Sequence, residues 1–136
     1  MRVESRARAR ALQALYAWDV RGGQDLGGVA SQLWDDLVVG VDERRIADAL
    51  LDTARHHLPE LDTLLAEVTT NWRLERLGVV ERCVLRLGAA ELRRGETPPR
   101  VVIREALRLA ERYGSPESAR FVNGVLDALA RKMGRL

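Results

Sequence analysis

The chain has 136 residues, 46% of them hydrophobic and 31% charged, a composition that predicts a single soluble globular domain over residues 1–136. The only cysteine, Cys83, excludes an intrachain disulfide framework and favours a reducing compartment. No stretch approaches the roughly 18 apolar residues of a membrane span, and no apolar stretch follows the N-terminal arginines as it would in a signal peptide. We therefore expect a cytoplasmic protein that does not associate with a membrane.

The net charge of +2 is unevenly distributed along the chain. Residues 1–21 carry a net charge of +3, residues 22–80 carry −6, and residues 81–136 carry +5. Basic ends suggest a nucleic-acid surface, and an acidic middle suggests a face for a basic partner. Chance clustering in an arginine-rich composition explains the same distribution equally well, so composition leaves both interpretations open.

Apolar residues recur at intervals of three or four along almost the whole chain, which is the pattern of amphipathic helices. No stretch alternates with period two for long enough to predict a strand. The sequence therefore predicts an all-α fold, a single compact bundle of about seven helices. The expected helices cover residues 5–21, 29–39, 42–57, 59–68, 78–94, 97–113 and 115 onward.

Residues with known preferences at helix ends set these boundaries. Glycines between residues 22 and 28 predict a flexible loop, and Asp42 is expected to cap the third helix. Pro59 is expected to break the following stretch and to begin a new helix. At the last helix, Ser115 supplies a cap and Glu117 an acid beside the positive end of the helix dipole.

Reactive side chains are few, and they do not converge. His56 and His57 are the only histidines, and neighbours on a helix point about 100° apart. Cys83 lies in an amphipathic pattern that favours the core. The glycines of residues 22–28 lack the Gly-Lys-Ser/Thr ending of a phosphate-binding loop. We expect no catalytic residues, no metal site and no cofactor, so an enzyme is the least favoured class of function.

Arginines alternate with other residues at the N-terminus, where Arg6, Arg8 and Arg10 follow Arg2. Guanidinium groups form bidentate hydrogen bonds with phosphates, stack on bases and stay charged at physiological pH. Tyr16, further along the same helix, offers a ring on which an unpaired base can stack. These five residues are the candidate RNA contacts. The alternative is a solubilising N-terminal arm, with Tyr16 in the core.

Two features elsewhere are open to a structural explanation. Four arginines at intervals of four form one edge of a predicted helix, for which a salt-bridged solvent face is favoured: Arg100, Arg104, Arg108 and Arg112. In the last helix, Gly124 follows Asn123 within an apolar pattern, although a mid-helix glycine costs about 1 kcal/mol relative to alanine. The small residue suggests that another helix approaches there. Trp18 is expected in the core.

Three separated segments of the chain, in order, resemble the NusB family of transcription antitermination factors. The first is the opening helix, from Arg6 to Tyr16. The second comprises Asn71-Trp72-Arg73-Leu74, Leu77, Glu81-Arg82, Leu85-Arg86 and Glu91-Leu92. The third comprises Ile103, Glu105-Ala106, Leu109-Ala110, Tyr113-Gly114, Ser118 and Phe121-Val122-Asn123-Gly124-Val125-Leu126-Asp127. The resemblance therefore spans essentially the full length of the chain.

This resemblance implies two packed helical subdomains and a function. Family members bind single-stranded boxA RNA of ribosomal RNA transcripts together with NusE, a small ribosomal subunit protein, and join a complex with other Nus factors on RNA polymerase. Family members occur as monomers and dimers, so a homodimer stays open. The resemblance implies RNA contacts on the first helix and at the start of the last, namely Arg6, Arg8, Tyr16, Glu117, Arg120 and Phe121. It places Glu81 on a partner-binding face.

A second function class fits the same sequence. A NusB-like fold could serve as a protein–protein interaction module whose RNA binding is weak or lost. Salt-dependent binding to single-stranded RNA separates this alternative from the RNA-binding factor.

Overall fold

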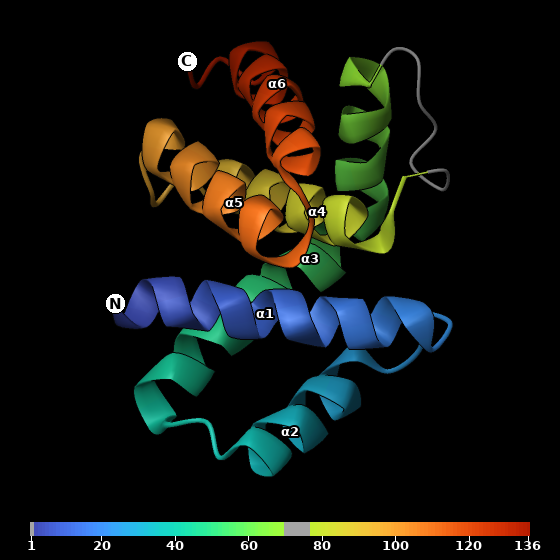
Figure 1. Ribbon diagram of the computed structural model, residues 1–136, viewed down its shortest axis with the longest axis vertical. Helices are drawn as coiled ribbons and strands as arrows, with labels where there is room; N and C mark the ends of the chain where they lie inside the picture. The colour runs from blue at the N-terminus through green and yellow to red at the C-terminus, as the bar shows by residue number, and fades with distance from the viewer. Residues whose placement is uncertain (1, 70–76) are drawn as a thin grey trace.

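The computed structural model describes residues 2–69 and 77–136, which form six α-helices and no strand (Figure 1). The helices are α1 (Val3–Val20), α2 (Leu26–Leu37), α3 (Val41–Val68), α4 (Val79–Arg94), α5 (Pro99–Tyr113) and α6 (Pro116–Lys132). The all-α prediction is confirmed for this part of the chain, whereas the number of about seven helices is wrong. The sequence motif at residues 71–74 lies outside the described residues.

The difference in helix number arises in α3, which runs through Pro59, where the sequence predicts a break. A proline inside a helix removes one backbone hydrogen bond and costs about 3 kcal/mol. Downstream of it, Leu61 and Leu65 are both 0% exposed. Full burial contributes about 1.5–3 kcal/mol for each leucine, so tertiary packing offsets the cost of the proline. As a consequence, His56 and His57 lie within a helix and not at a helix end.

Two other helix starts differ from the predicted ones. The helix α2 begins at Leu26, because the side chain of Asp25 accepts a hydrogen bond from the backbone N–H of Gly28 at 3.0 Å. Part of the predicted glycine loop therefore belongs to this helix. The helix α3 begins at Val41 with Gly40 at the cap position, so Asp42 lies in the first turn and does not cap it.

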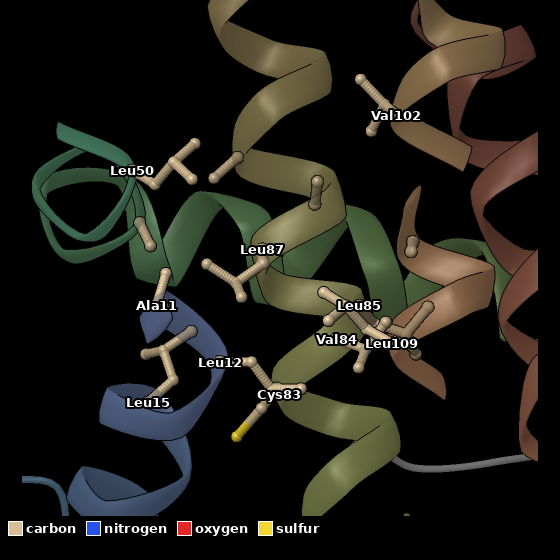
Figure 2. Packing of buried hydrophobic residues seen from close by; sticks show 14 of the residues in the cluster. Ala11, Leu12, Leu15, Leu50, Cys83, Val84, Leu85, Leu87, Val102 and Leu109 are labelled. Atoms are coloured by element: carbon tan, nitrogen blue, oxygen red, sulfur yellow. The ribbon is translucent and has the colours of Figure 1, made fainter. Parts of the chain in front are cut away.

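The helix α4 is central, in contact with α1, α3, α5 and α6. Figure 2 shows its apolar side chains directed toward residues of three neighbouring helices. Six of its hydrophobic residues are 0% exposed, namely Cys83, Val84, Leu85, Ala89, Ala90 and Leu92. Buried residues of all six helices belong to one contiguous core cluster, and Trp18 packs against it as expected.

Two glycines have opposite environments. A Cβ added to Gly88 of α4 would lie 2.7 Å from Cδ1 of Leu126 on α6, so the missing side chain allows these two helices to approach closely. A Cβ added to Gly124 would meet nothing within 4 Å, and Gly124 is exposed. The close helix approach suggested for Gly124 is therefore wrong, and Gly88 has that role.

The ends of the last three helices follow their sequence signals. Gly95 ends α4 with φ of 73°, the left-handed conformation that favours glycine. Ser115 caps α6 by accepting a hydrogen bond from the backbone N–H of Ser118 at 3.1 Å. These local signals fix the direction in which α6 leaves α5, and thereby the position of its first turn.

Candidate nucleic-acid interface

The first turns of α1 carry three arginines that diverge around the helix axis. The helix buries a face that includes Ala7 and Ala11, both 0% exposed. Arg6 and Arg10 are four residues apart and lie on one side, whereas Arg8 is rotated by about 200° from each. The three guanidinium groups therefore meet different partners.

Arg8 forms a buried ion-pair cluster that joins α1, α4 and α5. Its Nε and Nη2 donate to the two carboxylate oxygens of Glu91 at 2.8 Å each, and its Nη1 donates to Glu105 at 3.1 Å. Ser5 also donates a hydrogen bond to Glu105. The hydrogen bond to Glu91 raises the pKa of Arg8 despite its burial. Burial alone would raise the pKa of Glu105, but the Ser5 hydrogen bond and the Arg8 charge lower it overall.

Arg6 and Arg10 share one acceptor on α3. The Nε of Arg6 donates to Glu43 Oε1, and the Nε of Arg10 donates to Glu43 Oε2, both at 2.9 Å. Burial opposes ionisation of Glu43, yet the two hydrogen bonds lower its pKa overall. The side chains of Arg6 and Arg10 remain 49% and 30% exposed. Both arginines are thus reachable from solvent while held in position.

Aromatic rings lie further along the same side of the bundle. Tyr16 is 44% exposed, so its ring is available for stacking and is not in the core. Gln13, one turn before it, donates to the hydroxyl of Tyr113 at 3.2 Å, which joins α1 to the end of α5. The guanidinium carbon of Arg112 lies 5.1 Å from the centroid of the Tyr113 ring, a cation–π contact.

The first turn of α6 presents the other residues predicted to contact RNA. The side chains of Glu117 and Arg120 are 76% and 78% exposed and form a loose pair at 3.7 Å. A backbone hydrogen bond at the helix start and the Ser115 hydroxyl lower the pKa of Glu117. Phe121 is partly buried and packs against the core. Phe121 therefore anchors this part of α6 while some of its ring stays exposed.

Glu81, predicted on a partner face, lies against this same turn. Its Oε1 accepts a hydrogen bond from the hydroxyl of Ser118 at 2.5 Å. The start of α4 and the start of α6 are therefore in direct contact, although they are 37 residues apart in sequence. The structure thus joins the expected partner face to the expected RNA surface.

Two open grooves flank α5. The α1–α5 groove has a volume of about 590 Å³, and Arg2, Arg8, Arg104 and Arg108 are among its lining residues. The α5–α6 groove has a volume of about 460 Å³, and Arg100, Arg104, Arg108 and Arg131 are among its lining residues. Both grooves are rich in arginine, and neither is an enclosed cavity for a small molecule.

Sequence reasoning missed the acids that hold the arginines in place. Arg82 donates two hydrogen bonds to Asp19, and Arg86 bridges Asp19 and Asp62, which ties α1 and α3 to α4. The hydrogen bond from Arg82 lowers the pKa of Asp19, and the nearby positive charges add to the effect. The sequence signal that could have predicted these ion pairs is the spacing of Arg82 and Arg86, four residues apart on a mostly apolar helix.

Features of other protein classes are not found among the described residues. No group of three or more potential ligands could hold a metal ion there. Burial raises the pKa of the Cys83 thiol to about 12, so it is a packing residue and a poor nucleophile. Within residues 2–69 and 77–136, every helix is too short or too polar to cross a membrane.

Comparison with known proteins identifies relatives over nearly the whole chain. The model of the NusB family matches residues 5–131. The transcription antitermination protein NusB of Sorangium cellulosum (strain So ce56) is 42% identical over 137 residues, which cover 100% of this chain and 97% of that protein. The protein of the same description from Solibacter usitatus (strain Ellin6076) is 42% identical over 132 residues, with 94% and 88% coverage.

Solved structures agree with these sequence matches. A chain in a crystal structure of the antitermination factors NusB and NusE in complex with double-stranded RNA superposes with a TM-score of 0.89 at 34% identity, covering 97% of this chain and 98% of that one. The solution structure of NusB from Aquifex aeolicus gives a TM-score of 0.84 at 35% identity, covering 96% and 89%.

Proposed function

This chain belongs to the NusB family of transcription antitermination factors, which are not enzymes, and from that premise we propose how it binds RNA and a partner. It binds single-stranded boxA-type RNA of ribosomal RNA transcripts together with a NusE-type ribosomal protein. The pair then joins other Nus factors in an antitermination complex on RNA polymerase. The observation that carries the proposal is the surface on which Arg6, Arg10 and Tyr16 of α1 are exposed.

The RNA contacts divide into two kinds. Arg6 and Arg10 neutralise phosphates, and the exposed ring of Tyr16 stacks on an unpaired base. Arg2, Glu117, Arg120 and Phe121 extend the surface on both sides. We assign Arg8 to the scaffold, because three of its donors are bound to Glu91 and Glu105.

The partner binds at the start of α4, where Glu81 lies. The similar structure that contains both NusB and NusE supports a partner of this class. The net charge of −6 on residues 22–80 favours a basic partner. Because Glu81 accepts a hydrogen bond from Ser118 of α6, a partner at this position lies beside the RNA surface.

A second candidate function is a protein-interaction module with weak RNA binding. The observation that favours it is the shared acceptor of Arg6 and Arg10. Glu43 neutralises part of their charge within the protein, so fewer counterions would be released when RNA binds. This alternative predicts the same partner contact and almost no salt-dependent RNA affinity.

Titration of fluorescent boxA-type RNA, with and without the cognate NusE-type protein, tests the proposal. The variant with Arg6→Gln and Arg10→Gln should reduce the salt slope by up to about 1.4, at about 0.7 per lost contact to a single strand. Tyr16→Ala should weaken binding by about 1–3 kcal/mol. Partner-dependent tightening of about 5- to 150-fold is expected for a coupled pair.

Two controls sharpen the result. Arg55→Gln removes an exposed arginine from α3 that pairs with Asp52, and should leave the slope unchanged. A double-stranded version of the same RNA separates stacking on Tyr16 from backbone binding, because paired bases are not free to stack on a side chain. If RNA affinity is weak and does not change with salt concentration, with Tyr16→Ala or with added partner, only the interaction module remains.

A further inference from the structure

We propose that the exposed edge of α5 binds the phosphates of an RNA strand beyond the segment held by α1 and the start of α6. This α5 arginine edge consists of Arg100, Arg104 and Arg108, with Arg131 facing them from α6. The inference rests on the proposed RNA-binding function and extends it to a second surface.

The edge is a ridge between two grooves. Arg104 and Arg108 line both the α1–α5 groove and the α5–α6 groove, so their side chains are accessible from either side. The α1–α5 groove also contains Arg2 and Ser5, at the start of the helix that carries the candidate RNA contacts. Figure 1 shows α1, α5 and α6 following one another across one side of the molecule. A strand that passes Arg2 at the start of α1 can therefore continue onto the ridge.

Two arginines of this edge lack the ion pairs that hold Arg6, Arg8 and Arg10 in place. Neither Arg100 nor Arg104 forms an ion pair with any residue in the described parts of the chain. Arg108 pairs with Glu105 at 3.2 Å, yet its side chain is 68% exposed. Like charges four residues apart on a helix repel each other, so the row destabilises α5 slightly unless an anion binds it. The salt-bridged solvent face expected from the sequence is thus absent at its first two positions.

The dimensions of the edge suit a nucleic-acid backbone. Four helical residues advance by about 6 Å, so the row from Arg100 to Arg108 is about 12 Å long. Phosphates of a stacked strand are spaced by about 3.4 Å along the axis, so the row faces about three or four of them. Two acids, Glu111 and Asp127, lie in the α5–α6 groove against four arginines, which leaves an excess of positive charge.

The α1–α5 groove connects the edge to Arg2, the first of the candidate RNA contacts, and this connection favours RNA over an acidic protein segment. Arg131 is 64% exposed and pairs with Asp127 of its own helix, at 2.9 Å, so it can also turn toward a phosphate. The groove floor between the arginines includes Ile103 and Leu107 but no aromatic ring among its lining residues. We therefore expect binding through phosphates without preference for the base sequence.

The test compares a short boxA-type RNA of about 10 nucleotides with the same RNA extended by about 10 uridines, lengths near the site sizes of single-strand binders. The variant Arg100→Gln/Arg104→Gln breaks no ion pair within residues 2–69 and 77–136, so the fold should be retained. For the extended RNA, we expect about a fivefold loss of affinity per contact at 0.1 M salt, and a salt slope smaller by about 1.4. Affinity for the short RNA should stay within about twofold of wild type.

A matched control, Arg45→Gln/Arg55→Gln, removes two exposed arginines of α3 that line neither groove. The proposal is overturned if this control weakens the extended RNA equally, or if the edge variant binds it like wild type. Polyglutamate serves as a probe for an acidic protein ligand. The proposal is also overturned if the edge variant loses affinity for polyglutamate but not for the extended RNA, which would indicate an acidic protein ligand. The short RNA separates the two proposals. If its binding depends on Arg6 and the edge variant has no effect on either RNA, this proposal is wrong and the proposed function stands. Failure of wild type to bind either RNA would remove both.

Discussion

Replacement of Arg8 by alanine should destabilise the protein far more than it weakens RNA binding directly. The side chains of Arg8, Glu91 and Glu105 are only 12%, 9% and 8% exposed. Removal of one partner from a buried ion pair costs about 3–5 kcal/mol, because the remaining charge stays buried without compensation. Here two carboxylates lose their cation. At about 3 °C per kcal/mol for a domain of this size, the midpoint of thermal unfolding should fall by about 10 °C or more.

Two variants test this interpretation by calorimetry and urea unfolding. Arg6→Ala, at a side chain that is 49% exposed, should cost less than about 1 kcal/mol. A triple variant, Arg8→Met with Glu91→Leu and Glu105→Met, should recover much of the loss, since apolar residues can replace a buried ionic cluster. If Arg8→Ala unfolds at the temperature of Arg6→Ala and loses RNA affinity to the same degree, then Arg8 is an RNA contact and the structural role is wrong.

Three further outcomes follow from the same contacts. Gly88→Ala should lower the free energy of unfolding by about 1 kcal/mol in urea titrations because its Cβ meets the buried Leu126, whereas Gly124→Ala, in open space, should raise it by up to about 1 kcal/mol. Glu43→Gln should strengthen RNA binding about two- to fivefold at low salt, and equal affinities would show that the pairing does not restrain the arginines. As the pH falls below about 4, the free energy of unfolding should decrease, because the folded-state pKa of Asp19 is lowered and the unfolded chain then binds more protons than the folded protein. In Asp19→Asn that part of the pH dependence should vanish.

Local sequence signals predicted those parts of the fold that depend on a few neighbouring residues. Gly95 ends a helix and Ser115 begins one in the structure, as their residue types suggest, because a cap is satisfied within one turn. Pro59 shows the limit of this reasoning. Its local cost is real, but the burial of Leu61 and Leu65 depends on helices elsewhere in the chain, which no local pattern reveals.

The candidate site was predictable in composition but not in the roles of its members. Arg6, Arg8 and Arg10 are equivalent in sequence, yet Arg8 meets carboxylates 83 and 97 residues away. The glycines show the same difficulty: the sequence suggested a close helix approach at Gly124, and only packing between α4 and α6 shows that Gly88 makes it. Pairing between distant elements is therefore what the sequence could not supply.

The contact between Ser118 and Glu81 gives a physical route for coupling between partner and RNA. A partner that binds the Glu81 carboxylate competes with the Ser118 hydroxyl, which lies two residues before the exposed Arg120. Release of that bond would change the start of α6, where RNA is proposed to bind, and the coupling must be equal in both directions. Ser118→Ala keeps the backbone N–H that Ser115 caps, so the helix should still form. We expect this variant to bind partner and RNA separately as wild type does, but to lose most of the partner-dependent tightening in titrations of RNA at several fixed partner concentrations. Undiminished tightening in Ser118→Ala would show that the two ligands are coupled through direct contact with each other and not through α6.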